Sequence, residues 1–179
     1  VLEALSEAES FIYRRLRHWK MLKRATGSMT ANAVPAASPT DYIAQPSDFL
    51  EDQILFITGV YASQVIRKTE QDVIANYQYN ADGYLVPTTP QFFYTDQTNI
   101  YFNCPPDQAY PYILMYYQQL TALATSVDNF LTSMYPRLMR CACMIGACEF
   151  AKDSGQGQFD RTYWIGEAEK EIAMAQSES

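Results

Sequence analysis

Residues 110–118, YPYILMYYQ, join aromatic and branched apolar side chains in one run that is typical of a β-strand. Successive side chains of a strand point to opposite faces, and here both faces are apolar. The two predicted faces hold Tyr112, Leu114 and Tyr116 on one side and Ile113, Met115 and Tyr117 on the other. We therefore expect a strand covered on both sides, with a neighbouring subunit among the candidate covers. The candidate inter-subunit packing residues of this strand are Tyr112, Tyr116 and Tyr117.

Further strand-like runs precede this segment within residues 42–120. A short strand ends at residue 57, and others are predicted at residues 64–68, 91–95 and 99–103. Most connections between them are too short for the crossover that parallel strands require; only residues 70–78 leave room for a small helix. The pattern predicts a small, mostly antiparallel sheet.

Helical periodicity marks both ends of the chain. Near the amino end, apolar residues recur at steps of three and four, which predicts an amphipathic helix over residues 1–24. Residues 25–41, rich in proline and small side chains, predict a linker, and residues 128–176 predict a helical hairpin. The apolar stripe of the first helix consists of Leu2, Leu5, Ala8, Ile12, Leu16 and Trp19.

Together these elements predict an α+β fold in a single domain over residues 1–179. The first helix and the carboxyl-terminal hairpin are expected to form a helical core, into which the small antiparallel sheet of residues 42–120 is inserted. With 179 residues, 48% of them hydrophobic, the chain can build a core without disulfides or metal.

Three of the four cysteines lie within residues 140–149, RCACMIGACE. On a helix Cys141 and Cys143 point to nearly opposite sides, and Cys141 and Cys148 are about 10 Å apart along the axis. Neither pair suits a disulfide or a zinc site, and the chain has one histidine. We expect a buried apolar helix with no metal and no cofactor, in which Cys143, together with Trp164 of the next helix, is a candidate for inter-subunit packing.

Charge is distributed unevenly along the chain. The net charge is −7, yet six of the thirteen basic residues fall within eleven positions and form a candidate partner interface. These six residues are Arg14, Arg15, Arg17, Lys20, Lys23 and Arg24. The acidic remainder argues against a general nucleic-acid binder. An accessory protein that binds nucleic acid through this basic helix and the sheet tyrosines is retained as the alternative function.

Neither catalysis nor membrane insertion is indicated. His18 lies among basic residues with no patterned nucleophile, and we expect it to be an exposed helix histidine; common catalytic and phosphate-binding motifs are absent from the sequence. No stretch approaches the roughly 20 apolar residues of a membrane span. We expect a non-enzymatic protein that is made in a cytoplasm.

The order of several weak motifs resembles the head-to-tail connector, or adaptor, proteins of tailed bacteriophages. The resemblance covers roughly residues 5–175 and depends on this order, because each motif alone is common. The motifs are the first amphipathic helix with Arg14, Arg15 and Trp19, the segment Pro46 to Leu50, the run Asn99 to Pro106, Tyr116-Tyr117, and Tyr135-Pro136 opening a helix rich in alanine and cysteine.

The resemblance implies a structural virion protein without catalytic residues. Copies would form a ring of twelve under the portal vertex, extend the DNA channel and offer a platform for tail components. The implied partners are the portal protein, further copies of the chain, tail or neck proteins, and genomic DNA that passes without sequence-specific binding; no membrane is implied. The implied location is the neck of the virion, after assembly in the host cytoplasm.

Overall fold

The computed structural model describes residues 2–31, 41–59, 62–121, 129–153 and 160–178. These residues divide into two compact units. The helical unit is discontinuous in sequence and comprises Val1–Met21 and Gln119–Ser179, whereas the sheet unit is the continuous segment Leu22–Gln118.

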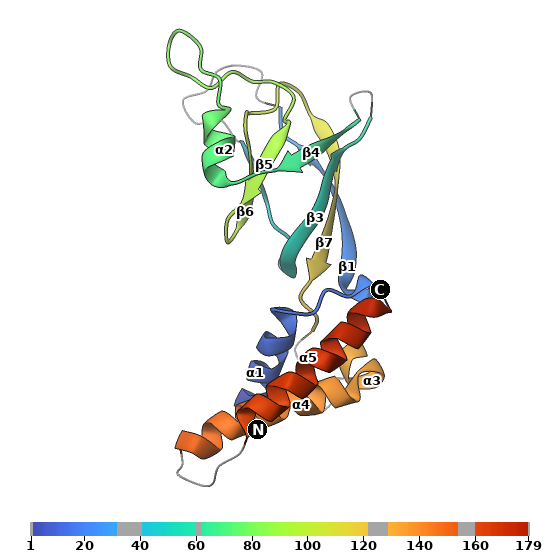
Figure 1. Ribbon diagram of the computed structural model, residues 1–179. Helices are drawn as coiled ribbons and strands as arrows, with labels where there is room; N and C mark the ends of the chain where they lie inside the picture. Colours follow the sequence, from blue (N-terminus) through green and yellow to red (C-terminus); the bar gives the residue numbers. More distant parts are fainter. Residues whose placement is uncertain (1, 32–40, 60–61, 122–128, 154–159, 179) are drawn as a thin grey trace. The chain divides into compact units, whose positions relative to one another are not determined.

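The sheet unit contains one seven-stranded mixed sheet (Figure 1). The strand order is β1-β7-β3-β4-β5-β6-β2, so β7 pairs antiparallel with β1 on one side and with β3 on the other. Leu114 of β7, for example, pairs with Ala25 of β1 and with Leu55 of β3. The strands are β1 Leu22–Met29, β2 Tyr42–Ala44, β3 Phe49–Ile57, β4 Ser63–Arg67, β5 Phe92–Thr95, β6 Asn99–Phe102 and β7 Tyr110–Gln118.

A single crossover makes the sheet mixed. Strands β4 and β5 run parallel, with Ile66 opposite Phe92, and helix α2 (Glu70–Ala75) lies in the connection between them. Thr69 caps this helix by accepting a hydrogen bond from the Asp72 amide. The connection covers residues 68–91, and α2 lies within residues 70–78, where the sequence predicts a small helix. A parallel pair requires such a long return path.

The inner face of the sheet encloses a core of its own. Phe93 and Phe102 are almost fully buried, as are Leu114 and Tyr116 of β7 and Leu55 of β3. Side chains of these strands alternate between the core and the outer face, which is the pattern of a sheet packed on one side. The core of this unit therefore comes from the strands and does not require the helices.

The helical unit is built around α4 (Pro136–Asp153), which packs against α1 (Leu2–Tyr13) and α5 (Arg161–Ser177). Asn129 opens the short helix α3 (Phe130–Met134) with a reciprocal capping box, and Asp160 caps α5 by accepting from the Tyr163 amide. The three long helices bury Ala8, Ile12, Leu138, Cys141, Ala142, Ile145, Cys148, Ala168, Ile172 and Ala175.

Ion pairs join α4 to α5. The Arg137 guanidinium lies 2.8 Å from the Glu167 carboxylate and 3.1 Å from the Glu171 carboxylate, and Lys170 bonds Glu167 at 2.7 Å. Glu171 is buried, so its pairing with Arg137 compensates the removal of its charge from water. The hairpin expected over residues 128–176 is thus held by both apolar and ionic contacts.

The prediction of a helical core with a small inserted antiparallel sheet is wrong. The sheet has seven strands, is mixed, and forms a unit with a separate core. The strands predicted near residues 57, 64–68, 91–95, 99–103 and 110–118 are confirmed, but β1 and β2 add two that were not expected.

The first helix was predicted to run to residue 24, but α1 ends at Tyr13 and Trp19–Met21 forms a 3₁₀ turn. Residues 22–29 are strand β1 because their backbone pairs along the full length of β7. Gly27 fits this position, since a Cβ there would lie 2.6 Å from the Tyr112 hydroxyl oxygen. Of the expected linker, residues 32–40 lie outside the described part of the chain.

Truncating Phe93 tests the separate core of the sheet unit. Phe93 is 1% exposed, so Phe93→Ala should lower the free energy of unfolding by about 3–5 kcal/mol through lost burial and a cavity. Phe56→Ala is the matched control on the outer face, where the ring is 37% exposed, and should cost much less. Urea denaturation followed by circular dichroism measures both variants, and equal losses would contradict the placement of Phe93 in the core.

Candidate interaction surfaces

The basic segment is divided between the two units. Arg14, Arg15, Arg17 and Lys20 belong to the helical unit, whereas Lys23 and Arg24 lie on β1 of the sheet unit. The sequence prediction of one basic helix therefore does not describe this segment. Only the first four residues share the helical unit, and Lys23 and Arg24 belong to a different surface.

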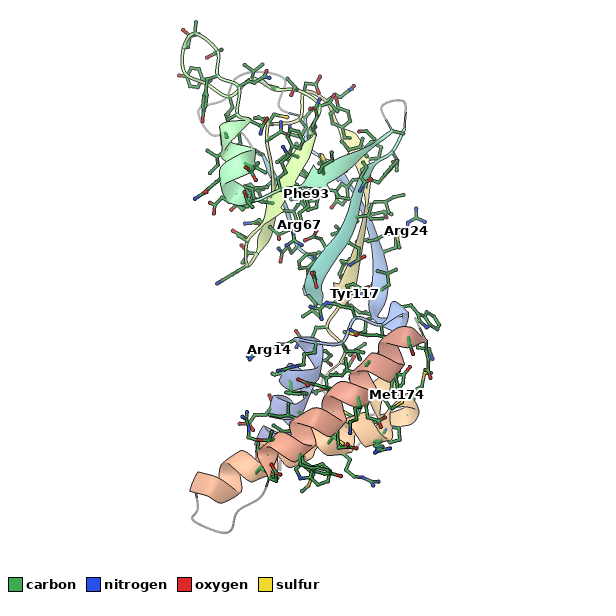
Figure 2. All side chains as sticks on the ribbon, in the orientation of Figure 1. Arg14, Arg24, Arg67, Phe93, Tyr117 and Met174 are labelled. Carbon is green, nitrogen blue, oxygen red and sulfur yellow. The ribbon has the colours of Figure 1, made fainter. Side chains whose placement is uncertain are left out.

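Within the helical unit the basic side chains have different roles. Arg17 donates hydrogen bonds to the carbonyl of Tyr13, the last residue of α1, at 2.6 Å and to the carbonyl of Leu16 beyond it at 2.9 Å. The Arg15 guanidinium lies 4.1 Å from the centre of the Phe11 ring, and both Arg14 and Arg15 are exposed (Figure 2 labels Arg14). Arg14 and Arg15 thus have exposed side chains, while Arg17 has a local structural role.

His18 is buried in an aromatic cluster, although the sequence predicted an exposed histidine. Its ring stacks on Phe130 at 5.3 Å between centroids, and its Nδ1 accepts a hydrogen bond from the Lys20 amide at 3.2 Å. The Nε2 atom lies 3.2 Å from the Tyr135 hydroxyl, which in turn donates to the Glu178 carboxylate at 2.9 Å. This chain of hydrogen bonds fits a neutral imidazole, because Nδ1 must accept.

Acidification should destabilise the chain partly through His18. Burial lowers the pKa of His18 in the folded state, and Lys20 acts in the same direction against an opposing effect of Glu178. The unfolded chain therefore binds the proton more readily, so this contribution to stability is present above about pH 6.5 and is lost as the pH falls below it.

His18→Phe keeps an aromatic ring but cannot titrate, so the variant should lose less stability than the wild type between about pH 7.5 and about pH 5.5. The midpoint of thermal unfolding at each pH measures the difference. Identical pH dependence in both proteins would show that His18 does not carry this effect.

In the sheet unit, an open groove of about 940 Å³ lies beside α2 and β5. Two basic residues, Arg67 and Lys68, line it together with the stacked rings of Tyr94 and Tyr101, whose centroids are 5.1 Å apart. Three carboxylates share the lining, from Glu70, Asp72 and Asp96. Bases with stacked aromatic rings suit single-stranded nucleic acid, but the carboxylates would repel its phosphates.

Arg67 also reaches a buried carboxylate. Its guanidinium lies 3.5 Å from Asp52 Oδ1, and the Asp52 side chain is 2% exposed. Burial raises the pKa of Asp52, and the positive charge of Arg67 opposes that rise. The ion pair with Asp52 gives Arg67 a structural role within the sheet unit. It also partly neutralises the positive charge of Arg67 in the groove.

The tyrosines proposed for inter-subunit packing divide between the two faces of β7. Tyr116 is buried, stacks on Phe49 and donates a hydrogen bond to Asp48 at 2.8 Å. Tyr112 also packs against the core of the chain, whereas Tyr117 is half-buried on the opposite face (Figure 2). Tyr117 is therefore the member of this set with a side chain on the outer face.

The two remaining candidates lie on the helical hairpin. Cys143 of α4 and Trp164 of α5 are both half-buried, and Trp164 meets Tyr163 edge to face at 5.1 Å between centroids. All four cysteines are free thiols, and burial raises the pKa of both Cys141 and Cys143, which favours the protonated form over the metal-binding thiolate. No cluster of three or more potential metal ligands occurs within the described ranges.

Comparison with protein families matches the chain to a family over residues 1–179. The matching family is described as SU10 adaptor protein. The chain belongs to this family of phage head-tail adaptors, which confirms the resemblance drawn from the order of its motifs. It is a structural component of a virion and interacts with other virion components.

A comparison with curated proteins found no match. Among the described residues, no helix is both long enough and apolar enough to span a membrane.

Proposed function

We propose that the protein forms a ring at the neck of the virion, attaches there to the portal protein, continues the DNA channel and supports tail or neck components. The observation that carries this proposal is the family match over the entire chain. A ring of twelve copies is the expected stoichiometry. The proposed role is structural and not enzymatic, and it requires no cofactor.

The charge of the chain supports passive passage of DNA. Each copy has a net charge of −7, and no lysine or arginine occurs between residues 69 and 136. A ring of such subunits would present a negative potential over much of its surface, which disfavours adhesion of the DNA backbone. Genomic DNA would therefore pass through the channel without sequence-specific binding.

The exposed arginines of the helical unit are the proposed contact with the portal protein. Arg14 and Arg15 are exposed and suit carboxylates on a partner, because guanidinium groups bind carboxylates with two parallel hydrogen bonds. Arg17 contributes less to this surface, since it donates to carbonyls of its own chain.

Reversing the two exposed charges should weaken docking without unfolding the chain. Arg14→Glu combined with Arg15→Glu is expected to reduce affinity for the portal protein of the same phage by at least about tenfold. Arg140→Glu, which also reverses an exposed arginine but lies on α4, is the matched control. Light scattering of protein and portal mixtures measures docking, and undiminished docking of the double variant would contradict the assigned contact.

A nucleic-acid-binding accessory role is the second candidate, favoured by the stacked tyrosines beside Arg67 and Lys68. The adaptor role predicts weak DNA binding. The three carboxylates in the same groove agree with this expectation, because they would repel the phosphates of DNA. A titration with single-stranded and duplex DNA at several salt concentrations distinguishes the two roles. Tight binding that falls steeply with salt would favour the accessory role over the adaptor role.

A further inference from the structure

The outer face of the sheet unit carries apolar side chains where an antiparallel sheet exposed to water normally carries polar ones. On β7 this face holds Ile113 and Met115, both half-buried, with Tyr117 next along the strand. The pairing register places apolar neighbours on both flanking strands. We call the resulting group the outer patch; it consists of Leu22, Ile54, Phe56, Ile113, Met115 and Tyr117.

The outer patch is contiguous because its members are cross-strand neighbours. Met115 lies opposite Ile54 of β3, Ile113 lies opposite Phe56, and Tyr117 lies opposite Leu22 of β1. Ile54 is 42% exposed and Phe56 37% exposed. Contiguous apolar surface of this kind on a folded protein is typical of a binding site.

Arg24 stands at the margin of the outer patch, opposite Met115 (Figure 2). It is one of four basic residues in the sheet unit, and the other three have partners: Lys23 bonds Asp48, Arg67 pairs with Asp52, and Lys68 lies over the Phe92 ring. Among the residues that the structure describes, Arg24 makes no hydrogen bond and no ion pair. An apolar surface with an unpaired arginine calls for an occupant that is apolar and acidic.

The same chain carries such a surface at α2. Helix α2 packs against β5, and β3 and β4 separate β5 from β7 in the strand order, so this surface and the outer patch are different parts of the sheet unit. We call it the acidic flank; it consists of the exposed side chains of Glu70, Asp72 and Ile74 on α2 and of Tyr79, Asp82 and Tyr84, which are exposed in the segment that follows α2 in the chain.

We propose that the outer patch of one copy binds the acidic flank of the next copy. Arg24 then meets carboxylates of α2, and the apolar side chains of β3 and β7 cover Ile74 and the exposed tyrosines. Two different surfaces of one chain make a head-to-tail contact, which repeats from copy to copy and closes into a ring when the rotation allows. This inference rests on the proposed ring and specifies its interface.

A pair of matched methionine variants tests the outer patch. Met115→Glu places a charge at the centre of the patch, whereas Met174→Glu places the same charge on α5, where Met174 is 50% exposed (Figure 2). Met115→Glu should lower the number of copies assembled on each portal by at least about tenfold, and Met174→Glu should assemble like the wild type. Ile54→Glu, at a more exposed position of the patch, replaces Met115→Glu if that variant does not fold.

Charge reversal tests the orientation of the contact. Arg24→Glu should weaken assembly, and adding Glu70→Arg with Asp72→Arg to the same chain should restore it, because the two surfaces exchange their signs. Sedimentation of portal mixtures counts the bound copies. Failure of the combined variant to recover while Arg24→Glu is defective would place a different occupant on the patch and overturn the proposal.

The outcomes separate this inference from the proposed function. If the wild type does not assemble on the portal protein, the ring itself is wrong and the interface fails with it. If the wild type assembles and the Met115→Glu or Ile54→Glu chain assembles equally well, the ring stands and the outer patch is not its interface. A Met115→Glu chain that stays folded and docks without forming a ring supports both.

Discussion

The sheet unit depends on the position of β7 between β1 and β3. Both sides of its backbone are hydrogen-bonded, and its inner face supplies Leu114 and Tyr116 to the core. Because a strand has two faces, the residues that alternate with these are directed outward in fixed register. The same strand pairing therefore builds the core and sets which apolar side chains lie on the outer face. A shift of the pairing register by one residue would move the core side chains to the outer face and the outer side chains into the core.

Periodicity predicted most of the individual strands and helices, but it did not predict how they are arranged in the fold. The aromatic run of β7 and the helical hairpin were evident because each keeps one period over many residues, and α2 lies where the sequence predicts a small helix. The parallel pairing of β4 with β5 was not predicted. Strand β1 was not predicted because the helical spacing of apolar residues continues past the end of α1 to Trp19, close to where β1 begins. Its assignment as a strand depends on pairing with residues 110–117, which local periodicity cannot reveal.

The interaction surfaces were less predictable for the same reason. Six basic residues adjacent in sequence belong to two units, and only pairing shows that Lys23 bonds Asp48 while Arg24 does not. His18 is buried because residues 130 and 135, more than a hundred positions away, supply rings around it. The order of weak motifs identified the family because the motifs are spread over most of the chain. The family match likewise covers residues 1–179.

The discontinuity of the helical unit has a consequence for biosynthesis. Helix α1 is synthesised before the sheet unit, but its packing partner α4 begins at Pro136, after the whole sheet unit has been made. The sheet unit is one continuous segment and can fold during translation, whereas the apolar stripe of α1 has no packing partner until α4 has been made. The surface that carries Arg14 and Arg15 is therefore completed only after the sheet unit has been synthesised, because α1 needs α4 to pack against.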